Sequence, residues 1–272
     1  MKKTFLTCLT VVVGMGLVFG IAGAAKTITI KGSTTALPIA VACAEAFMNQ
    51  NYEINISVAG GGSGVGIASI IDGTADIGNS SRSIKDSERE KAKSNGIDTY
   101  ENIVAADGIA VIVNPKNTVS ELTLDQIKAI YTGKINNWKE VGGANKRIVI
   151  VSRDSSSGTF EAFNELALDK EKVRPDALMN ASNNTVAQIV ANTPLAIGYI
   201  GIGYISESIK AVTVNGITCT KENVVNGTYP IARNLYMYTK GSPAGVVKEF
   251  IDFILSPEGQ KLVDKAGFVA IK

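Results

Sequence analysis

The stretch that decides the fold is Val149–Phe160, which reads VIVSRDSSSGTF. The apolar residues at its start are typical of a buried strand, and those after Thr159 recur at the spacing of a helix. A hydroxyl-rich turn therefore leads into a helix N-terminus, where unpaired backbone N–H groups favour a bound anion. Arg153 adds a planar guanidinium that can hold two oxygens of one oxyanion. Taken alone, these residues are equally well explained by a helix cap and a surface ion pair with Asp154.

Two earlier stretches repeat the order of strand, hydroxyl-bearing turn and helix. The turn GSTT over 32–35 follows an alternating strand and precedes a helix with Pro38 in its first turn. The turn GGGSGVG over 60–66, with Ser63 inside it, follows a second strand but lacks the Lys-Ser/Thr ending of a P-loop. Strands that alternate with helices predict parallel sheets, whose ligands bind at the carboxyl ends of the strands. We therefore expect these turns to meet.

The composition excludes several classes of function. The 272 residues carry a net charge of +2 and no histidine. No block of like charge is present to hold a nucleic acid. Without histidine, Ser-His-Asp and Cys-His catalysis and histidine zinc sites are impossible. We expect a binding protein without a cofactor, and a phosphatase that uses one of the serines is the weaker alternative.

The N-terminus has the pattern of a signal peptide over 1–24. Lys2 and Lys3 precede the apolar run Phe5–Ile21, and small residues at 22–24 fit a cleavage site. Export follows from this pattern, and an uncleaved membrane anchor is the alternative. After cleavage Cys43 and Cys219 remain, and either a disulfide or two inert core thiols would fit.

Two apolar segments predict crossings between two α/β lobes. Asn102–Asn114 is expected to form two strand pieces broken near Asp107, and Ile231–Thr239 is expected to form the return strand. The first lobe would then span 25–107 with the return segment 231–272, and the second lobe would span 108–230.

The motifs GSTT, GGGSGVG, TADIGNSSR, ADGIAVIVNP, IYTGKINNW and RDSSSGT occur in this order along the chain. Together they resemble the phosphate-binding protein of bacterial and archaeal phosphate ABC importers, in its compact form. The resemblance implies the α/β, two-lobed type II periplasmic-binding-protein fold, with two crossover strands and a ligand cleft between the lobes. It also implies a monomer, periplasmic or otherwise extracytoplasmic and free or membrane-tethered, that delivers inorganic phosphate to a membrane permease with its ATPase.

The resemblance also implies a set of phosphate-binding residues, found by matching motifs residue by residue. They are Thr34, Thr35, Ser63, Asp76, Arg153, Ser157, Gly158 and Thr159. One position departs from the pattern of the larger family members, which have an acidic residue two places after the arginine. Here that place is Ser155, while Asp154 is adjacent to Arg153, so a pairing of Asp154 with Arg153 is left open.

Asp76 would give such a site its selectivity. A carboxylate can accept a hydrogen bond from an anion that still carries a proton, as phosphate does at neutral pH. Sulfate has no such proton, and two facing acceptors would be desolvated without a bond. This hypothesis favours phosphate over the alternatives, which are a receptor for arsenate, sulfate or molybdate and a phosphate sensor without a transport role.

Overall fold

The computed structural model describes residues 26–271. Within this range one nine-stranded sheet runs through both halves of the molecule in the order β2-β1-β3-β11-β4-β8-β6-β7, with β9 beside β4. The predicted signal peptide lies outside the described residues. Between residues 26 and 271 no helix is both long enough and apolar enough to cross a membrane.

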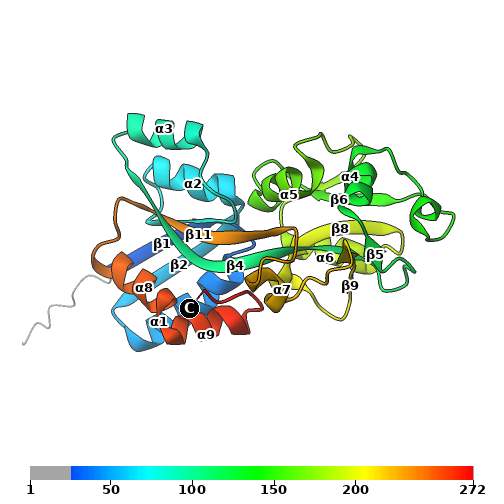
Figure 1. The fold of residues 1–272 in the computed structure, drawn as a ribbon. Helices are drawn as coiled ribbons and strands as arrows, with labels where there is room; N and C mark the ends of the chain where they lie inside the picture. The colour runs from blue at the N-terminus through cyan, green and yellow to red at the C-terminus, as the bar shows by residue number, and fades with distance from the viewer. Residues whose placement is uncertain (1–25, 272) are drawn as a thin grey trace, which may run out of the picture.

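The first lobe is built on the parallel strands β1, β2 and β3, with β11 antiparallel to β3. Helices α1, α8 and α9 cover one face of this sheet, and α2 and α3 cover the other (Figure 1). The bounds are β1 Lys26–Gly32, α1 Leu37–Gln50, β2 Ile54–Gly61, α2 Ser63–Ile71, β3 Ile77–Ser80, α3 Asp86–Ser94, β11 Ala232–Lys240, α8 Gly245–Leu255 and α9 Pro257–Lys265.

The second lobe is built on β6, which lies parallel to both β7 and β8. Helices α4 and α5 lie on one side of these strands, and α6 and α7 lie on the other (Figure 1). Tyr131, Phe163 and Tyr199 pack their rings together in the core, with the Phe163 and Tyr199 rings stacked at 3.9 Å. The bounds are β5 Glu121–Leu122, α4 Leu124–Thr132, β6 Val149–Arg153, α5 Gly158–Leu168, β7 Leu178–Asn180, α6 Asn183–Asn192, β8 Ala196–Gly201, β9 Lys210–Ala211, β10 Thr213–Val214 and α7 Lys221–Val225.

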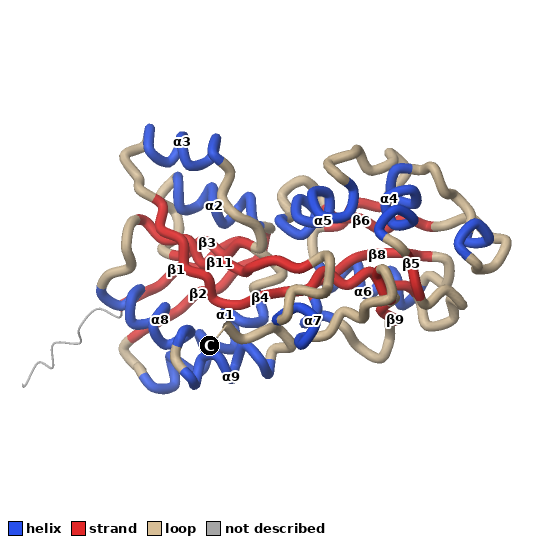
Figure 2. The backbone as a smooth tube through the Cα atoms, viewed as in Figure 1, coloured by secondary structure: helices blue, strands red, loops and turns tan. Residues whose placement is uncertain are grey.

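Strand β4, Thr99–Val113, joins the two lobes without a break (Figure 2). It pairs with β11 as far as Gly108 and with β8 from Ile109 onward, antiparallel in both cases. The prediction of two strand pieces is therefore wrong, because only the partner strand changes at this point. The predicted parallel pairing holds within each lobe, but the sheet as a whole is mixed, since the crossing strands β4 and β11 run antiparallel to their neighbours. The lobe boundaries at 107/108 and 230/231 stay predictions.

The two cysteines of the described chain, Cys43 and Cys219, are free and buried. Cys43 lies on the inner face of α1, which packs against the sheet of the first lobe. Burial raises the pKa of each thiol to about 12. The sequence left open either a disulfide or two inert core thiols, and the structure shows two core thiols.

Candidate functional site

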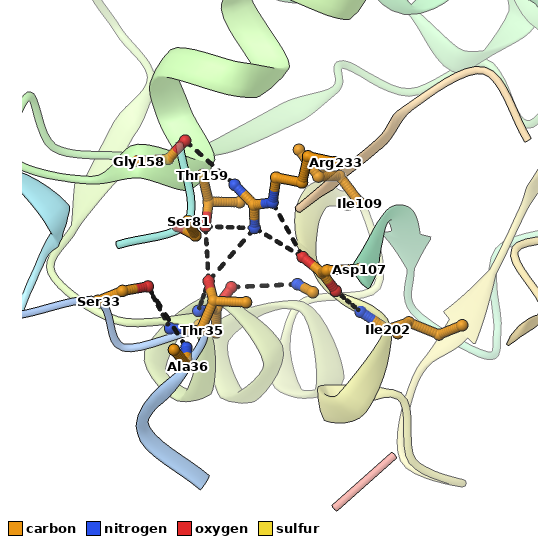
Figure 3. Close-up of polar contacts among 12 residues, drawn as sticks. Ser33, Thr35, Ala36, Ser81, Asp107, Ile109, Gly158, Thr159, Ile202 and Arg233 are labelled. Atoms are coloured by element: carbon orange, nitrogen blue, oxygen red, sulfur yellow. Dashed lines mark hydrogen bonds and ion pairs between the residues drawn. The ribbon is translucent and has the colours of Figure 1, made fainter. Parts of the chain in front are cut away.

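The hydroxyl turns of the sequence, which follow β1, β2 and β6, meet between the two lobes, and the residues that follow β3 join them. The turn after β1 is held in place because the Ser33 N–H donates to the carbonyl oxygen of Asn79 in β3 at 2.8 Å. The Ser33 side chain then accepts from the Thr35 N–H at 3.1 Å, which shapes the start of α1. Figure 3 shows Thr35 of this turn facing Thr159 at the start of α5. The prediction that these turns lie close together is therefore confirmed.

Thr34 and Thr35 belong to the first lobe but receive hydrogen bonds from the second. The Asn183 amide donates to Oγ1 of Thr34 at 3.2 Å and to Oγ1 of Thr35 at 3.0 Å. Asn183 is itself fully buried at the start of α6, and its Oδ1 accepts from the Gly201 N–H. Because the threonine oxygens already accept these bonds, their own protons are left to donate elsewhere.

Arg153 lies at the end of β6 with only 1% of its surface exposed. Its Nε donates to the Asn180 carbonyl at 3.0 Å, and its Nη2 donates to the Ala181 carbonyl and to Thr34 Oγ1. Its Nη1 is buried without a hydrogen-bond partner among the described residues. Burial lowers the pKa of this guanidinium from its ordinary value. An unpartnered, buried and positively charged Nη1 suits an anionic ligand, because leaving such a donor without a hydrogen bond costs free energy.

A second arginine, Arg233 of β11, contacts the same hydroxyls. Figure 3 shows its guanidinium between the Asp107 carboxylate and the hydroxyls of Thr35 and Thr159. Its Nη2 lies 2.8 Å from Oδ2 of Asp107, 2.9 Å from Thr159 Oγ1 and 3.3 Å from Thr35 Oγ1. Burial raises the pKa of Asp107 and lowers that of Arg233, and the attraction between them opposes both shifts. The second oxygen of Asp107 accepts from the Ile202 N–H, so both oxygens of this carboxylate are already bonded.

The start of α5 brings the remaining predicted residues into the cluster. Ser157 is the N-cap of the helix, and its Oγ accepts from the Phe160 N–H at 3.2 Å. Thr159 shares a 2.8 Å hydrogen bond with Thr35 across the lobes. Gly158 lies against Ser63, which accepts from the Ser81 N–H at 2.9 Å. The hydroxyl groups of both lobes thus face the N-terminus of one helix, a site that favours negative charge.

The lobes are in contact around this cluster, so the structure is a closed form. The Gly64 N–H donates to the Ser156 carbonyl at 3.0 Å, and the Ser156 hydroxyl donates to the Gly61 carbonyl at 3.1 Å. On another side of the cluster the Tyr204 hydroxyl donates to the Thr34 carbonyl. Asp154 does not pair with Arg153 but accepts from the N–H and hydroxyl of Ser156.

Asp76 lies away from the cluster, which corrects the prediction that it faces the ligand. It directly precedes β3, and its Oδ2 accepts from the Thr29 N–H of β1 at 2.8 Å. The four residues of β3 separate it from Ser81, a distance of roughly 16 Å at the rise of a strand. In parallel strands the ligand edge is the carboxyl edge, and Asp76 stands at the opposite end of its strand. Its observed role is to bond the β1 backbone.

This position leads to a test of the corrected role. Asp76→Asn should leave the preference for phosphate over sulfate unchanged and should alter stability by less than about 0.5 kcal/mol, because the amide oxygen can still accept from Thr29. Isothermal titration with both anions, together with a thermal melt, measures the two quantities. If this variant no longer distinguished phosphate from sulfate, Asp76 would have to contact the ligand after all.

Residues that the sequence interpretation missed complete the cluster: Ser81, Asp107, Asn183 and Arg233. Ser81 had a signal, because it is the next-to-last residue of the TADIGNSSR motif and directly follows β3. Asp107 also had one, as a lone acid inside an apolar run. Asn183 and Arg233 had none, since each comes from an element distant in sequence from the turns they contact.

The charges of the cluster indicate what it can bind. Arg153 and Arg233 are cationic and Asp107 is anionic, so the buried ionised groups named here sum to +1. Most of the other groups are hydroxyls and an amide that can donate hydrogen bonds. Within residues 26–271 no group of acidic, cysteine or histidine side chains could hold a metal ion. The arrangement suits a small oxyanion held by many hydrogen bonds.

Comparisons with known proteins agree with this geometry. The family model described as the PBP superfamily domain matches residues 19–258. The phosphate-binding protein PstS of Bacillus subtilis is 38% identical over 250 residues, which cover 91% of this chain and 82% of that protein. The crystal structure of a Clostridium perfringens phosphate ABC transporter substrate-binding protein, with bound phosphate, superimposes with a TM-score of 0.85 at 39% identity and covers 91% of this chain and all of that one. An ABC-type phosphate transport receptor from Vibrio cholerae gives a TM-score of 0.74 at 34% identity, covering 89% of this chain and 99% of that one.

Proposed function

Because the chain belongs to the family of phosphate-binding proteins represented by its PstS relatives, we propose that it is the extracytoplasmic receptor that binds inorganic phosphate between its lobes and delivers it to an ABC-type phosphate importer. The partners are a membrane permease with its ATPase, and the receptor works as a monomer. The predicted signal peptide supports export. No chemical step is involved, since the family consists of binding proteins.

The observation that carries this proposal is the unpartnered Nη1 of Arg153, buried among hydroxyl groups that come from both lobes. We assign phosphate binding to seven of the predicted residues and to Ser81. The seven are Thr34, Thr35, Ser63, Arg153, Ser157, Gly158 and Thr159. Since they divide between the lobes, a ligand bound to all of them requires closure and favours the closed form.

Selectivity without Asp76 rests on the hydroxyls. Both oxygens of Asp107 already accept hydrogen bonds from the protein, one from the Ile202 N–H and the other from Arg233, so this carboxylate is engaged by the protein itself. A hydroxyl can either donate or accept. We therefore propose that serine hydroxyls accept the proton that phosphate retains, while sulfate offers only acceptors. The discrimination then comes from neutral groups and not from a lone carboxylate.

Titration of the purified mature protein with phosphate, arsenate and sulfate tests this function. We expect phosphate to bind with a Kd of about 1 μM or lower, equivalent to about 8 kcal/mol. Arsenate, with the same shape and protonation, should compete with phosphate, and sulfate should bind more weakly. Absence of heat with phosphate would refute the proposal, and tighter binding of sulfate or molybdate would favour a receptor for another oxyanion.

A further inference from the structure

A cluster of ion pairs outside the phosphate site connects the two lobes. Arg82, which follows β3 in the first lobe, has its Nε 2.7 Å from Oε2 of Glu161 in α5 of the second lobe. Lys85 of the first lobe approaches the same carboxylate oxygen at 3.0 Å. The Arg82 side chain is 8% exposed and the Glu161 side chain 20% exposed, so this contact is largely shielded from water.

The guanidinium of Arg82 is oriented before the lobes meet. Its Nη1 and Nη2 donate to the two oxygens of Glu88, in the same lobe, at 2.8 and 2.7 Å. Burial is the largest single influence on Glu88 and raises its pKa, but the hydrogen bonds from Arg82 and from the Lys85 N–H, together with the two positive charges, lower that pKa overall. Because the Arg82–Glu88 pair lies within one lobe, it persists when the lobes separate. Across the lobes, Nε of Arg82 lies close to Glu161 as an ion pair, without the alignment of a hydrogen bond.

Both ends of the contact lie next to the phosphate site in sequence. Arg82 directly follows Ser81, and Glu161 comes two residues after Thr159 in the first turn of α5. The two lobes also line a cavity of about 850 Å³ beside the contact, with Arg82 and Lys85 on one side and Phe160 and Glu161 on the other. Opening the cleft would move Glu161 away from both cations and return all three groups to water.

We propose that Arg82, Lys85 and Glu161 form an electrostatic latch that holds the lobes closed over the ligand and sets the rate of its release. This inference rests on the proposed function, because it concerns the dissociation of phosphate from the same site. The latch does not touch the ligand. It is a set of positioning residues that favours the closed state, and the affinity measured for a ligand scales with the population of that state.

The variant that tests the latch is Glu161→Gln, which keeps the shape of the side chain and removes its charge. We expect phosphate dissociation, followed by stopped-flow fluorescence, to become about tenfold faster, with a much smaller change in the association rate. Added salt should accelerate release from the wild type, because it screens the partly exposed pairs, and should have less effect on the variant. The melting temperature without phosphate should change little, since the cross-lobe pair contributes only in the fraction of ligand-free molecules whose lobes are closed.

The matched control is Glu165→Gln, one helical turn further along α5. Glu165 pairs with Lys170 of its own lobe at 3.2 Å, and both side chains are well exposed. This variant should release phosphate at the wild-type rate. Equal release rates for the wild type and Glu161→Gln, or an equal acceleration in both variants, would overturn the latch.

Failure of the latch can be distinguished from failure of the proposed function. A wild-type protein that binds no phosphate would refute the function, whatever the behaviour of the variants. Small-angle X-ray scattering would still test the latch in that case, because Glu161→Gln should have the larger mean radius of gyration. Identical scattering profiles would overturn the latch on their own.

Discussion

Arg153→Lys should weaken phosphate binding by about 100-fold or more, equivalent to about 3 kcal/mol. The arginine uses Nε and Nη2 to hold the carbonyl oxygens of Asn180 and Ala181, which leaves Nη1 for a ligand. A lysine keeps the positive charge but has a single ammonium, which cannot satisfy both carbonyl groups and the ligand together. Isothermal titration with phosphate measures the loss.

Arg147→Lys serves as the control for this variant. Arg147 lies shortly before the same strand, is 72% exposed and pairs with Asp176 at the surface. Its replacement should leave the phosphate affinity unchanged, since exposed ion pairs contribute little. Tight phosphate binding by Arg153→Lys would show that a positive charge at this position is enough to bind phosphate and that the planar guanidinium is not required.

Gly158→Ala should weaken phosphate binding by about 10- to 100-fold, by obstructing closure. A Cβ at this position would lie 2.3 Å from Oγ of Ser63 and 2.8 Å from Oγ of Ser81, both in the opposite lobe. The three atoms nearest to this Cβ all belong to the opposite lobe, and alanine favours a helix over glycine. The variant should therefore fold normally, keep its melting temperature and lose affinity through an incomplete approach of the lobes.

Gly64→Ala is the matched control, because Gly64 also lies in the first turn of a helix that faces the other lobe. A Cβ there would meet the nearest atom, the carbonyl oxygen of Ser156, at 3.5 Å, which is an ordinary contact. Phosphate affinity should be close to that of the wild type. If Gly158→Ala binds as tightly as Gly64→Ala, the lobes can close without the close contact between Gly158 and Ser63.

The sequence predicts those parts of the site in which the strand, the turn and the helix follow one another directly along the chain. In Val149–Phe160 the apolar run, the hydroxyl turn and the helical spacing lie together, and the structure has β6, the turn and α5 in that order. The capping box of Thr123 and Gln126 is another local feature of this kind, since the residue types and their spacing alone determine it.

Asp76 shows where that reasoning failed. Its motif contains a short strand, but the two residues that flank this strand are about 16 Å apart, and only one of them faces the ligand. The residue at the carboxyl end is Ser81, not Asp76. The acid and second arginine of the cluster could not be found by local patterns either. Asp107 and Arg233 are 126 residues apart and meet only because β4 and β11 pair antiparallel.

The buried state of Cys43 and Cys219 has a practical consequence for measurements on this protein. A thiol reacts with maleimide dyes as the thiolate, and with a pKa of about 12 each of these groups is almost entirely protonated at neutral pH. A cysteine introduced on the exposed rim of either lobe would therefore carry the dye selectively, without prior removal of the native thiols of the described chain. Such a conjugate would convert lobe movement into an optical signal, and the protein could serve as a reagentless sensor in solution.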